Sequence, residues 1–181
     1  EITLTHVHDV GLTLKHTATA DDKPIILTLA TGETDIQVND IIGTINFQAP
    51  DEGTGTDAIL VAAGIEAVSE GDFSSSNNAT KLSFKTAASE AAAEKMILSS
   101  AGNLGVGITP TNRLHVATGA DGVAARFQRA SGGGLIDIEA YNAIGGIGTS
   151  DNIPFRFNTN NTERVRITNG GDIEFKTDGV A

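Results

Sequence analysis

Residues 94–104 read Glu-Lys-Met-Ile-Leu-Ser-Ser-Ala-Gly-Asn-Leu, and residues 163–173 read Glu-Arg-Val-Arg-Ile-Thr-Asn-Gly-Gly-Asp-Ile. In both stretches an acid and a base precede a short strand. A small polar pair and a glycine turn follow, then Asn or Asp, then a new aliphatic residue. A motif that occurs twice predicts a repeat architecture, in which units bury their hydrophobic faces by stacking.

The similarity extends upstream of this motif. Residues 82–86 match residues 155–159, and at an offset of 100 residues 36–38 match residues 136–138. The offset falls to 69 at the motif, so the second copy lacks most of the equivalent of residues 49–78. We therefore expect an N-terminal β segment (1–13), a first β unit with an inserted excursion (14–107), a linker (108–113) and a second β unit (114–181).

Alternation of apolar and polar residues predicts the individual strands, because side chains on a strand point to opposite faces with a period of two. The strands expected from this pattern cover residues 2–8, 12–16, 25–30, 36–38, 41–47 and 59–68. Residues 87–96 have high helix propensity, but the run is short, so we expect a loop or a single helical turn there.

The composition favours an all-β fold of thin sheets. The chain of 181 residues has 21 Gly, 7 Phe, 1 Tyr and no Trp, and its hydrophobic content is 39%. Short aliphatic runs separated by glycine and small polar residues are typical of many short strands joined by tight turns. Few bulky side chains are present to fill a globular core, so we expect sheets that pack against copies of themselves.

Charge and composition exclude several functions. The formal net charge of −11 predicts repulsion from nucleic-acid phosphates and anionic lipid surfaces, so we expect no nucleic-acid partner. The absence of cysteine excludes disulfides and thiolate metal sites. No apolar stretch approaches the roughly 20 residues of a transmembrane helix, so we expect no membrane insertion. Because the chain begins at Glu1, we expect a fragment or a processed product of a longer protein.

Residues 96–116 (Met-Ile-Leu-Ser-Ser-Ala-Gly-Asn-Leu-Gly-Val-Gly-Ile-Thr-Pro-Thr-Asn-Arg-Leu-His-Val) resemble bacteriophage tail-fibre proteins. Those proteins carry a similar strand, Gly-Asn turn, Gly-Val-Gly segment, Thr/Pro turn and Leu-His-Val, often ahead of a C-terminal endosialidase-type intramolecular chaperone. Residues 2–12 are also similar to phage fibre sequences. The 181 residues match neither the chaperone domain nor a conventional virion-attachment domain of such proteins, so we expect them to be a segment separate from those domains.

The resemblance implies an elongated parallel homotrimer, a shaft or tip segment located in the virion and acting outside the host cell. Physical reasoning agrees, because short strands with open edges invite aggregation unless another chain covers them. Three chains around one axis would also let each apolar residue meet its symmetry mates.

His6 and His8 are the candidate metal ligands. Both lie on one face of the expected first strand, so three chains around an axis would supply six imidazoles, a set suited to an octahedral transition metal. The alternative is two partly exposed histidines beside Thr3 and Thr5, with no bound metal. No other cofactor is expected.

The remaining motifs do not indicate catalysis. Residues 102–107 are glycine-rich, but Pro110 follows where a phosphate-binding loop needs a helix. No Gly-x-Ser-x-Gly elbow occurs, and His115 belongs to the structural Leu-His-Val phrase, where we expect it to be packed or interfacial. Residues 51–57 are acidic enough for a calcium site but lack the dense spacing of oxygen ligands found in known calcium loops. Paired carboxylates would also suit a glycosidase, but aromatic sugar platforms are scarce. These candidate acids are Asp51, Glu52, Asp57, Glu66 and Glu70.

The excursion contains two small, polar segments, residues 49–56 and 70–80. Loops held by a rigid scaffold commonly carry recognition, so they are candidates for binding a host cell-surface glycan or protein. The alternative is a flexible connection without a ligand. The sequence thus predicts a non-enzymatic viral fibre segment for host attachment. The alternatives are a capsule-degrading tailspike glycosidase and a stalk module of a bacterial trimeric adhesin.

Overall fold

The computed structural model describes residues 2–8, 11–49, 57–130 and 134–176, and the regular secondary structure in these residues is almost entirely β. The predicted all-β class is therefore confirmed. Apart from one 3₁₀ turn, η1 (Asp57–Ile59), the elements are strands. They are β1 (Ile2–Val7), β2 (Gly11–His16), β3 (Ile41–Gln48), β4 (Val61–Ser69), β5 (Thr80–Thr86), β6 (Ala93–Leu98), β7 (Leu104–Val106), β8 (Leu114–Val116), β9 (Gly122–Gln128), β10 (Leu135–Ala140), β11 (Gly145–Gly148), β12 (Phe155–Thr159), β13 (Thr162–Ile167) and β14 (Ile173–Phe175).

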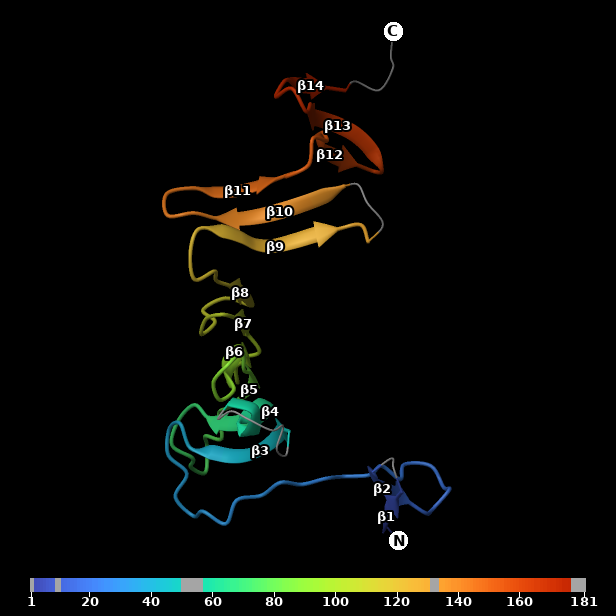
Figure 1. The fold of residues 1–181 in the computed structure, drawn as a ribbon, viewed down its shortest axis with the longest axis vertical. Coiled ribbons are helices and arrows are strands. Elements are labelled where there is room, and N and C mark those ends of the chain that lie inside the picture. Colours follow the sequence, from blue (N-terminus) through green and yellow to red (C-terminus); the bar gives the residue numbers. More distant parts are fainter. Residues whose placement is uncertain (1, 9–10, 50–56, 131–133, 177–181) are drawn as a thin grey trace.

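These strands form four separate sheets. The β1–β2 hairpin stands apart, β3 to β8 form a six-stranded sheet in chain order, and β9–β10–β11 and β12–β13–β14 form two three-stranded sheets. From β3 to β14 the elements follow one another along the long axis of the molecule, and most strands lie across that axis (Figure 1). The chain is therefore a long, thin stack rather than a globule.

The strands predicted at residues 2–8, 12–16, 41–47 and 59–68 correspond to β1, β2, β3 and β4. The strands predicted at residues 25–30 and 36–38 are absent, although the chain before β3 runs as an extended trace (Figure 1). The reason is pairing, because a strand needs a hydrogen-bonded neighbour and these segments have none in a ladder. Residues 87–92 form a loop without a helical turn, and β6 begins directly after it at Ala93.

The six-stranded sheet ends in an unusual parallel pair. Strands β3 to β7 are antiparallel neighbours, whereas β8 lies parallel to β7 after only the short connection 107–113. This tight return requires glycine at Gly105, where a Cβ atom would lie 2.2 Å from the carbonyl oxygen of Ile108 and 2.8 Å from Pro110 Cδ. The connection therefore folds back directly over β7.

The sheets β5–β6–β7 and β12–β13–β14 have the same hydrogen-bonded design. Phe84 pairs with Met96 as Phe157 pairs with Val165, and a bulge follows each of these pairs. The turns also correspond. In the first turn the backbone N–H groups of Gly102 and Asn103 both donate to Ser99, and in the second those of Gly171 and Asp172 both donate to Thr168. The β12–β13 connection is tighter, with positive φ at Asn160 and Asn161, as in a type I′ turn.

The single chain has very little core. In the described residues the buried hydrophobic side chains are Val68, Ala92, Ile97 and Leu135, while many large apolar side chains are exposed. The accessible surface is 13342 Å², whereas a compact monomer of 18.6 kDa exposes about 8,200 Å². Roughly 5,000 Å² of surface therefore remains that a compact fold of this mass would cover.

Candidate functional site

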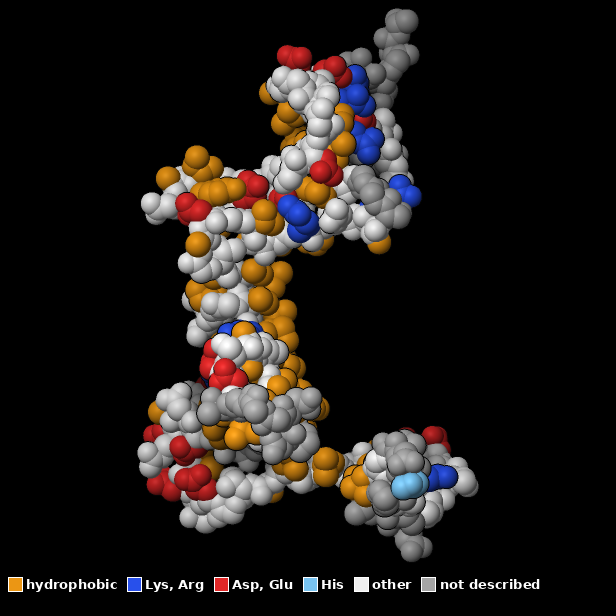
Figure 2. Space-filling view, viewed as in Figure 1, with side chains coloured by type: hydrophobic (Ala, Val, Ile, Leu, Met, Phe, Trp, Pro, Cys, Tyr) orange, Lys and Arg blue, Asp and Glu red, His pale blue; other side chains and the backbone are white. Residues whose placement is uncertain are grey.

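One face of the six-stranded sheet is apolar from edge to edge. Cross-strand partners on this face form two rows that run through all six strands, and none of their members is buried. The first row is Ile45, Ile65, Phe84, Met96, Val106 and Val116, and the second is Gly43, Ala67, Leu82, Leu98, Leu104 and Leu114. We call these two rows the apolar face of the β3–β8 sheet. Figure 2 shows hydrophobic side chains along one side of the stacked strands in the middle of the molecule.

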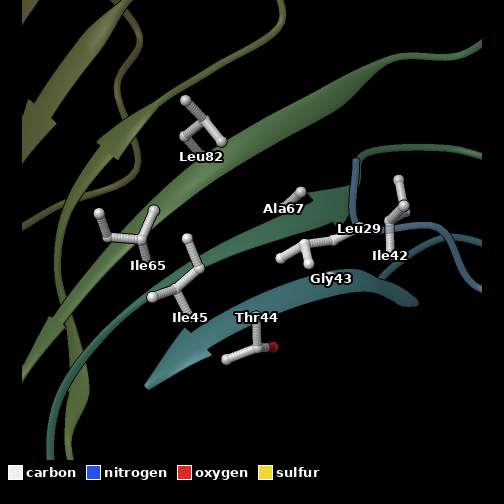
Figure 3. A pocket seen from close by; sticks show the side chains of 8 residues that line it. All are labelled: Leu29, Ile42, Gly43, Thr44, Ile45, Ile65, Ala67 and Leu82. Atoms are coloured by element: carbon white, nitrogen blue, oxygen red, sulfur yellow. The ribbon is translucent and has the colours of Figure 1, made fainter. Parts of the chain in front are cut away.

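A shallow cavity of about 160 Å³ marks the β3 end of the apolar face. Ile45, Ile65 and Leu82 rise from the same side of the sheet, whereas Thr44 points away from it (Figure 3). Leu29 comes from the extended segment before β3, and its Cβ would lie 3.3 Å from a Cβ added to Gly43. Within the described chain, therefore, one leucine covers a small part of this face at its β3 end.

The opposite face of the same sheet is polar and internally satisfied. Lys85 Nζ lies 2.8 Å from Glu66 Oε1 of the neighbouring strand, and Lys81 Nζ lies 2.9 Å from Glu94 Oε2. Between these ion pairs Ser83 and Ile97 are buried, at 2% and 3% exposure. Ile97 borders the connection that returns from β7 to β8. The apolar face, which lacks such cover, is the side available for association.

The β12–β13–β14 sheet repeats this two-sided pattern. Its apolar side carries Phe155, Ile167 and Ile173 in one row and Phe157, Val165 and Phe175 in the next. Its other side holds Glu163, whose Oε2 accepts a hydrogen bond from Arg166 Nη2 at 2.9 Å and lies 3.7 Å from Arg156 Nη1 in an ion pair. Arg166 Nε lies 2.8 Å from Glu163 Oε1 as an ion contact without hydrogen-bond geometry. Arg166 accordingly lowers the pKa of Glu163.

The β9–β10–β11 sheet is also apolar on one side, where Phe127 lies opposite Ile136, and Ile138 opposite Ile147. Phe127 and Ile147 are 63% and 64% exposed. Its other side encloses Asp137, which is fully buried.

Three hydrogen bonds compensate the buried carboxylate of Asp137. Arg126 donates from Nε and Nη2, both at 2.7 Å, and the Ser150 hydroxyl donates as well. These bonds from Arg126 and Ser150 lower the pKa of Asp137 to about 2. The group serves to fasten β9 to β10, and it offers no open position for a substrate.

The candidate metal ligands lie on and beside β1. His6 pairs across the hairpin with Leu12, but its side chain is outside the described part of the structure. His8 follows the strand and is exposed. The described residues contain no group of three or more His, Asp or Glu side chains close enough to hold a metal ion. The six-imidazole site would require three chains, so it stays a prediction.

The candidate acids are dispersed. Asp51 and Glu52 lie outside the described residues, Asp57 lies in η1, and Glu66 is paired with Lys85. Glu70 accepts a hydrogen bond from the Ser100 N–H at 2.8 Å. Those within the described residues therefore fasten or flank the scaffold, and they do not form a pair across a cleft.

Of the two candidate recognition loops, residues 70–80 are described, whereas residues 50–56 lie outside the described part. Hydrogen bonds within the loop stabilise residues 70–80. Asn77 Nδ2 donates to the carbonyl of Asp72 at 2.8 Å, and the Ser74 N–H donates to the carbonyl of Asn77 at 2.9 Å. Ser74, Ser75 and Ser76 are exposed. The loop thus presents hydroxyl groups from a hydrogen-bonded frame.

The glycine-rich segment 102–107 forms the turn and strand β7, and a tight loop follows it. His115 lies in β8, half-buried, with its Nδ1 3.3 Å from the Thr111 hydroxyl. This local role is a structural one. The signal for the apolar faces was present in the sequence as alternation in strands such as β5, β12 and β13, but only the pairing shows that apolar positions align across whole sheets.

Comparison of the chain with known protein families finds no match. A comparison with curated proteins also finds none. Among the described residues, no helix has the length and apolar character needed to cross a membrane.

Proposed function

We propose that this protein is a structural segment of a homotrimeric viral fibre, of the phage tail-fibre type, that serves host-cell attachment without catalysing a reaction. The observation that carries the proposal is the continuous apolar face of the β3–β8 sheet, repeated on the two sheets that follow it. Among the described residues, each of these three sheets has one side that its own chain leaves largely uncovered.

The exposed area supports obligate self-association. The chain exposes roughly 5,000 Å² beyond that of a compact monomer of its mass, and obligate interfaces bury about 2,000–5,000 Å² or more. In a rotational trimer each apolar row faces its symmetry copies, so the same row from three chains forms a common core. The number three comes from the resemblance of residues 96–116 to tail fibres.

The shape and the polar sides support an extracellular shaft or tip. Strands stacked along one axis build length at a low cost in residues, and the ion-paired sides would face solvent in such an assembly. The serine-rich loop at residues 70–80 then lies on a rigid scaffold, where recognition of a surface glycan or protein commonly occurs.

Sedimentation equilibrium tests the assembly. We expect a mass of about 56 kDa, three times the chain mass of 18.6 kDa. Leu98→Asp places a charge on the apolar face, where the side chain is 40% exposed in the single chain, and should reduce the mass to that of one chain. Lys95→Asp, at an exposed position of the same strand, is the matched control and should remain trimeric. A mass of 18.6 kDa for the unsubstituted protein contradicts the proposal.

Attachment is tested separately by incubating fluorescently labelled protein with candidate host cells. We expect saturable binding that an excess of unlabelled protein abolishes. Bulky substitutions of the exposed loop serines, such as Ser75→Trp and Ser76→Trp, should weaken binding while the trimer mass is retained. Shortening of a capsular polysaccharide by the protein would contradict the non-enzymatic role and favour a tailspike.

A further inference from the structure

The segment 24–30 (Pro-Ile-Ile-Leu-Thr-Leu-Ala) is an extended strand sequence without a strand partner. Its backbone makes no hydrogen bond with the described part of the chain. Ile26 and Leu27 are 74% and 67% exposed. An extended, apolar segment with free N–H and C=O groups is a template for pairing with another chain.

The second half of the molecule contains the matching residues in paired form. At the offset of 100, residues 22–28 correspond to β9 and residues 35–40 to β10. In that hairpin Phe127 pairs with Ile136, and Arg126 pairs with Asp137. The equivalent residues in the first half are Leu27 and Ile36, and Ile26 and Gln37. The first half therefore carries the strand sequence but not the hairpin.

The hairpin is missing because residues 36–40 are already engaged elsewhere. The Asn39 N–H donates to the carbonyl of Ser69 at 3.0 Å, and the Ser69 N–H donates to the carbonyl of Asp40 at 2.9 Å. The Val38 N–H donates to Asp72 Oδ1 at 3.0 Å. Ser69 and Asp72 belong to the excursion that the second copy lacks. Residues 36–40, the expected partner of segment 24–30, thus bind the excursion instead, and segment 24–30 stays unpaired.

The outer edge of β3 is an open sheet edge close to this segment. Strand β3 is the terminal strand of the six-stranded sheet, with β4 on its inner side. No backbone hydrogen bond is made on its outer side within the described residues. The extended segment runs from below β3 toward the β1–β2 hairpin, which stands away from the rest of the molecule (Figure 1). We call residues 24–30 the arm: Leu29 packs on Gly43 of its own sheet, whereas Ile26 and Leu27 are exposed and the backbone pairs with no described strand.

We infer that residues 24–30 add as a strand to the outer edge of β3 of a neighbouring copy of this chain. The inference rests on the trimer proposed above and specifies how its protomers are joined. Main-chain hydrogen bonds along the added strand would supply affinity, and alternate side chains would extend the apolar face of the neighbouring sheet. Each protomer would then give one arm and receive one, which closes a ring.

Disulfide trapping tests the exchange, and the natural absence of cysteine makes it clean. We combine Leu27→Cys with Ile45→Cys or with Phe47→Cys, because paired strands bring Cβ atoms within disulfide range. Oxidation of at least one double variant should give a covalent trimer on a non-reducing gel. Each single variant is the control and should remain a single chain. A cross-link confined to one chain, or none in either double variant, overturns the inference.

Proline substitution gives an independent reading. In an edge pairing, adjacent N–H groups point alternately toward and away from the partner, and proline removes the donor. Of Ile26→Pro and Leu27→Pro, one should lower the melting temperature of the trimer clearly and its neighbour should have little effect. Equal tolerance of both, at an unchanged trimer mass, contradicts arm exchange while leaving the fibre proposal standing. A monomer mass for the unsubstituted protein would contradict both.

Discussion

The segments 80–107 and 155–176 share one backbone design but differ on one of their two faces. The apolar faces correspond row by row, with Leu82 and Phe84 in the first segment and Phe155 and Phe157 in the second. The other faces differ. The first buries Ile97 between Ser83 and Gly105, whereas the second places Arg166 between Arg156 and Glu174. The face that stays apolar in both segments is the one that each leaves uncovered, which is expected if both meet the same kind of surroundings in an assembly.

The largest effect should come from the buried residue that distinguishes the first segment. Ile97→Ala removes a side chain that is 3% exposed and should lower the free energy of unfolding by about 2–5 kcal/mol. Arg166→Ala, at the matching position of β13, is half-buried and ion-paired and should cost clearly less. Urea denaturation of both variants measures the difference. Equal losses would show that the two faces are equivalent in energy.

The next test concerns the residues that face the return loop. Gly105→Ala would place a Cβ atom against the Ile108 carbonyl and should destabilise the protein by about 1–3 kcal/mol through overpacking. Glu174 occupies the matching position in β14, where a full side chain is accommodated. Glu174→Ala should therefore change the melting temperature little. A neutral Gly105→Ala would mean that the connection over β7 is not closely packed.

A smaller and equal effect is expected in the turns that the two segments share. Gly102 and Gly171 have φ values of 74° and 93°, a region in which a residue with a Cβ atom costs about 1–2 kcal/mol. Alanine at either position should lower the melting temperature by similar amounts. Clearly unequal shifts in calorimetry would break the correspondence between the two turns.

The last effect is confined to acid and concerns the sheet between the two segments. Because the pKa of Asp137 is lowered to about 2 in the folded protein, its contribution to stability is fully present above the unfolded pKa of about 4. The contribution is lost as the pH falls from there toward 2. Amide-exchange protection of β9 and β10 should decline over this window. Asp137→Asn should have reduced protection at neutral pH and a flatter acid response; an unchanged profile would contradict the role of the carboxylate.

Local sequence patterns predicted much of this fold but could not assign strand partners. Alternation identified β1 to β4 closely, and the repeated motif pointed to the turns at Gly102 and Gly171. The same alternation predicted strands at residues 25–30 and 36–38, where none form. Whether an extended segment becomes a strand depends on a neighbour, and here Ser69 and Asp72, distant in sequence, hold residues 38–40.

The candidate site shows the same limit. Alternation indicates one apolar side in strands such as β5, but only the register between strands aligns Phe84 with Met96 and Val106 in a continuous row. The burial of Ile97 depends on a loop that returns over β7, and no periodicity encodes such cover. The candidate ligands His6 and His8 lie on the first hairpin, apart from these faces, and their proposed role depends on an axis that a single chain does not contain.

The orientation of the strands has a mechanical consequence. Hydrogen bonds between strands run perpendicular to them, so in this molecule many of them run along the long axis (Figure 1). A force along that axis would act parallel to these hydrogen bonds. It would break them one pair after another, whereas a force along the strands would have to break many bonds at once. A single chain would therefore unfold under a weak pulling force. In the proposed trimer, resistance to tension would come from the lateral contacts between chains, so the surfaces that join the chains would also bear the load.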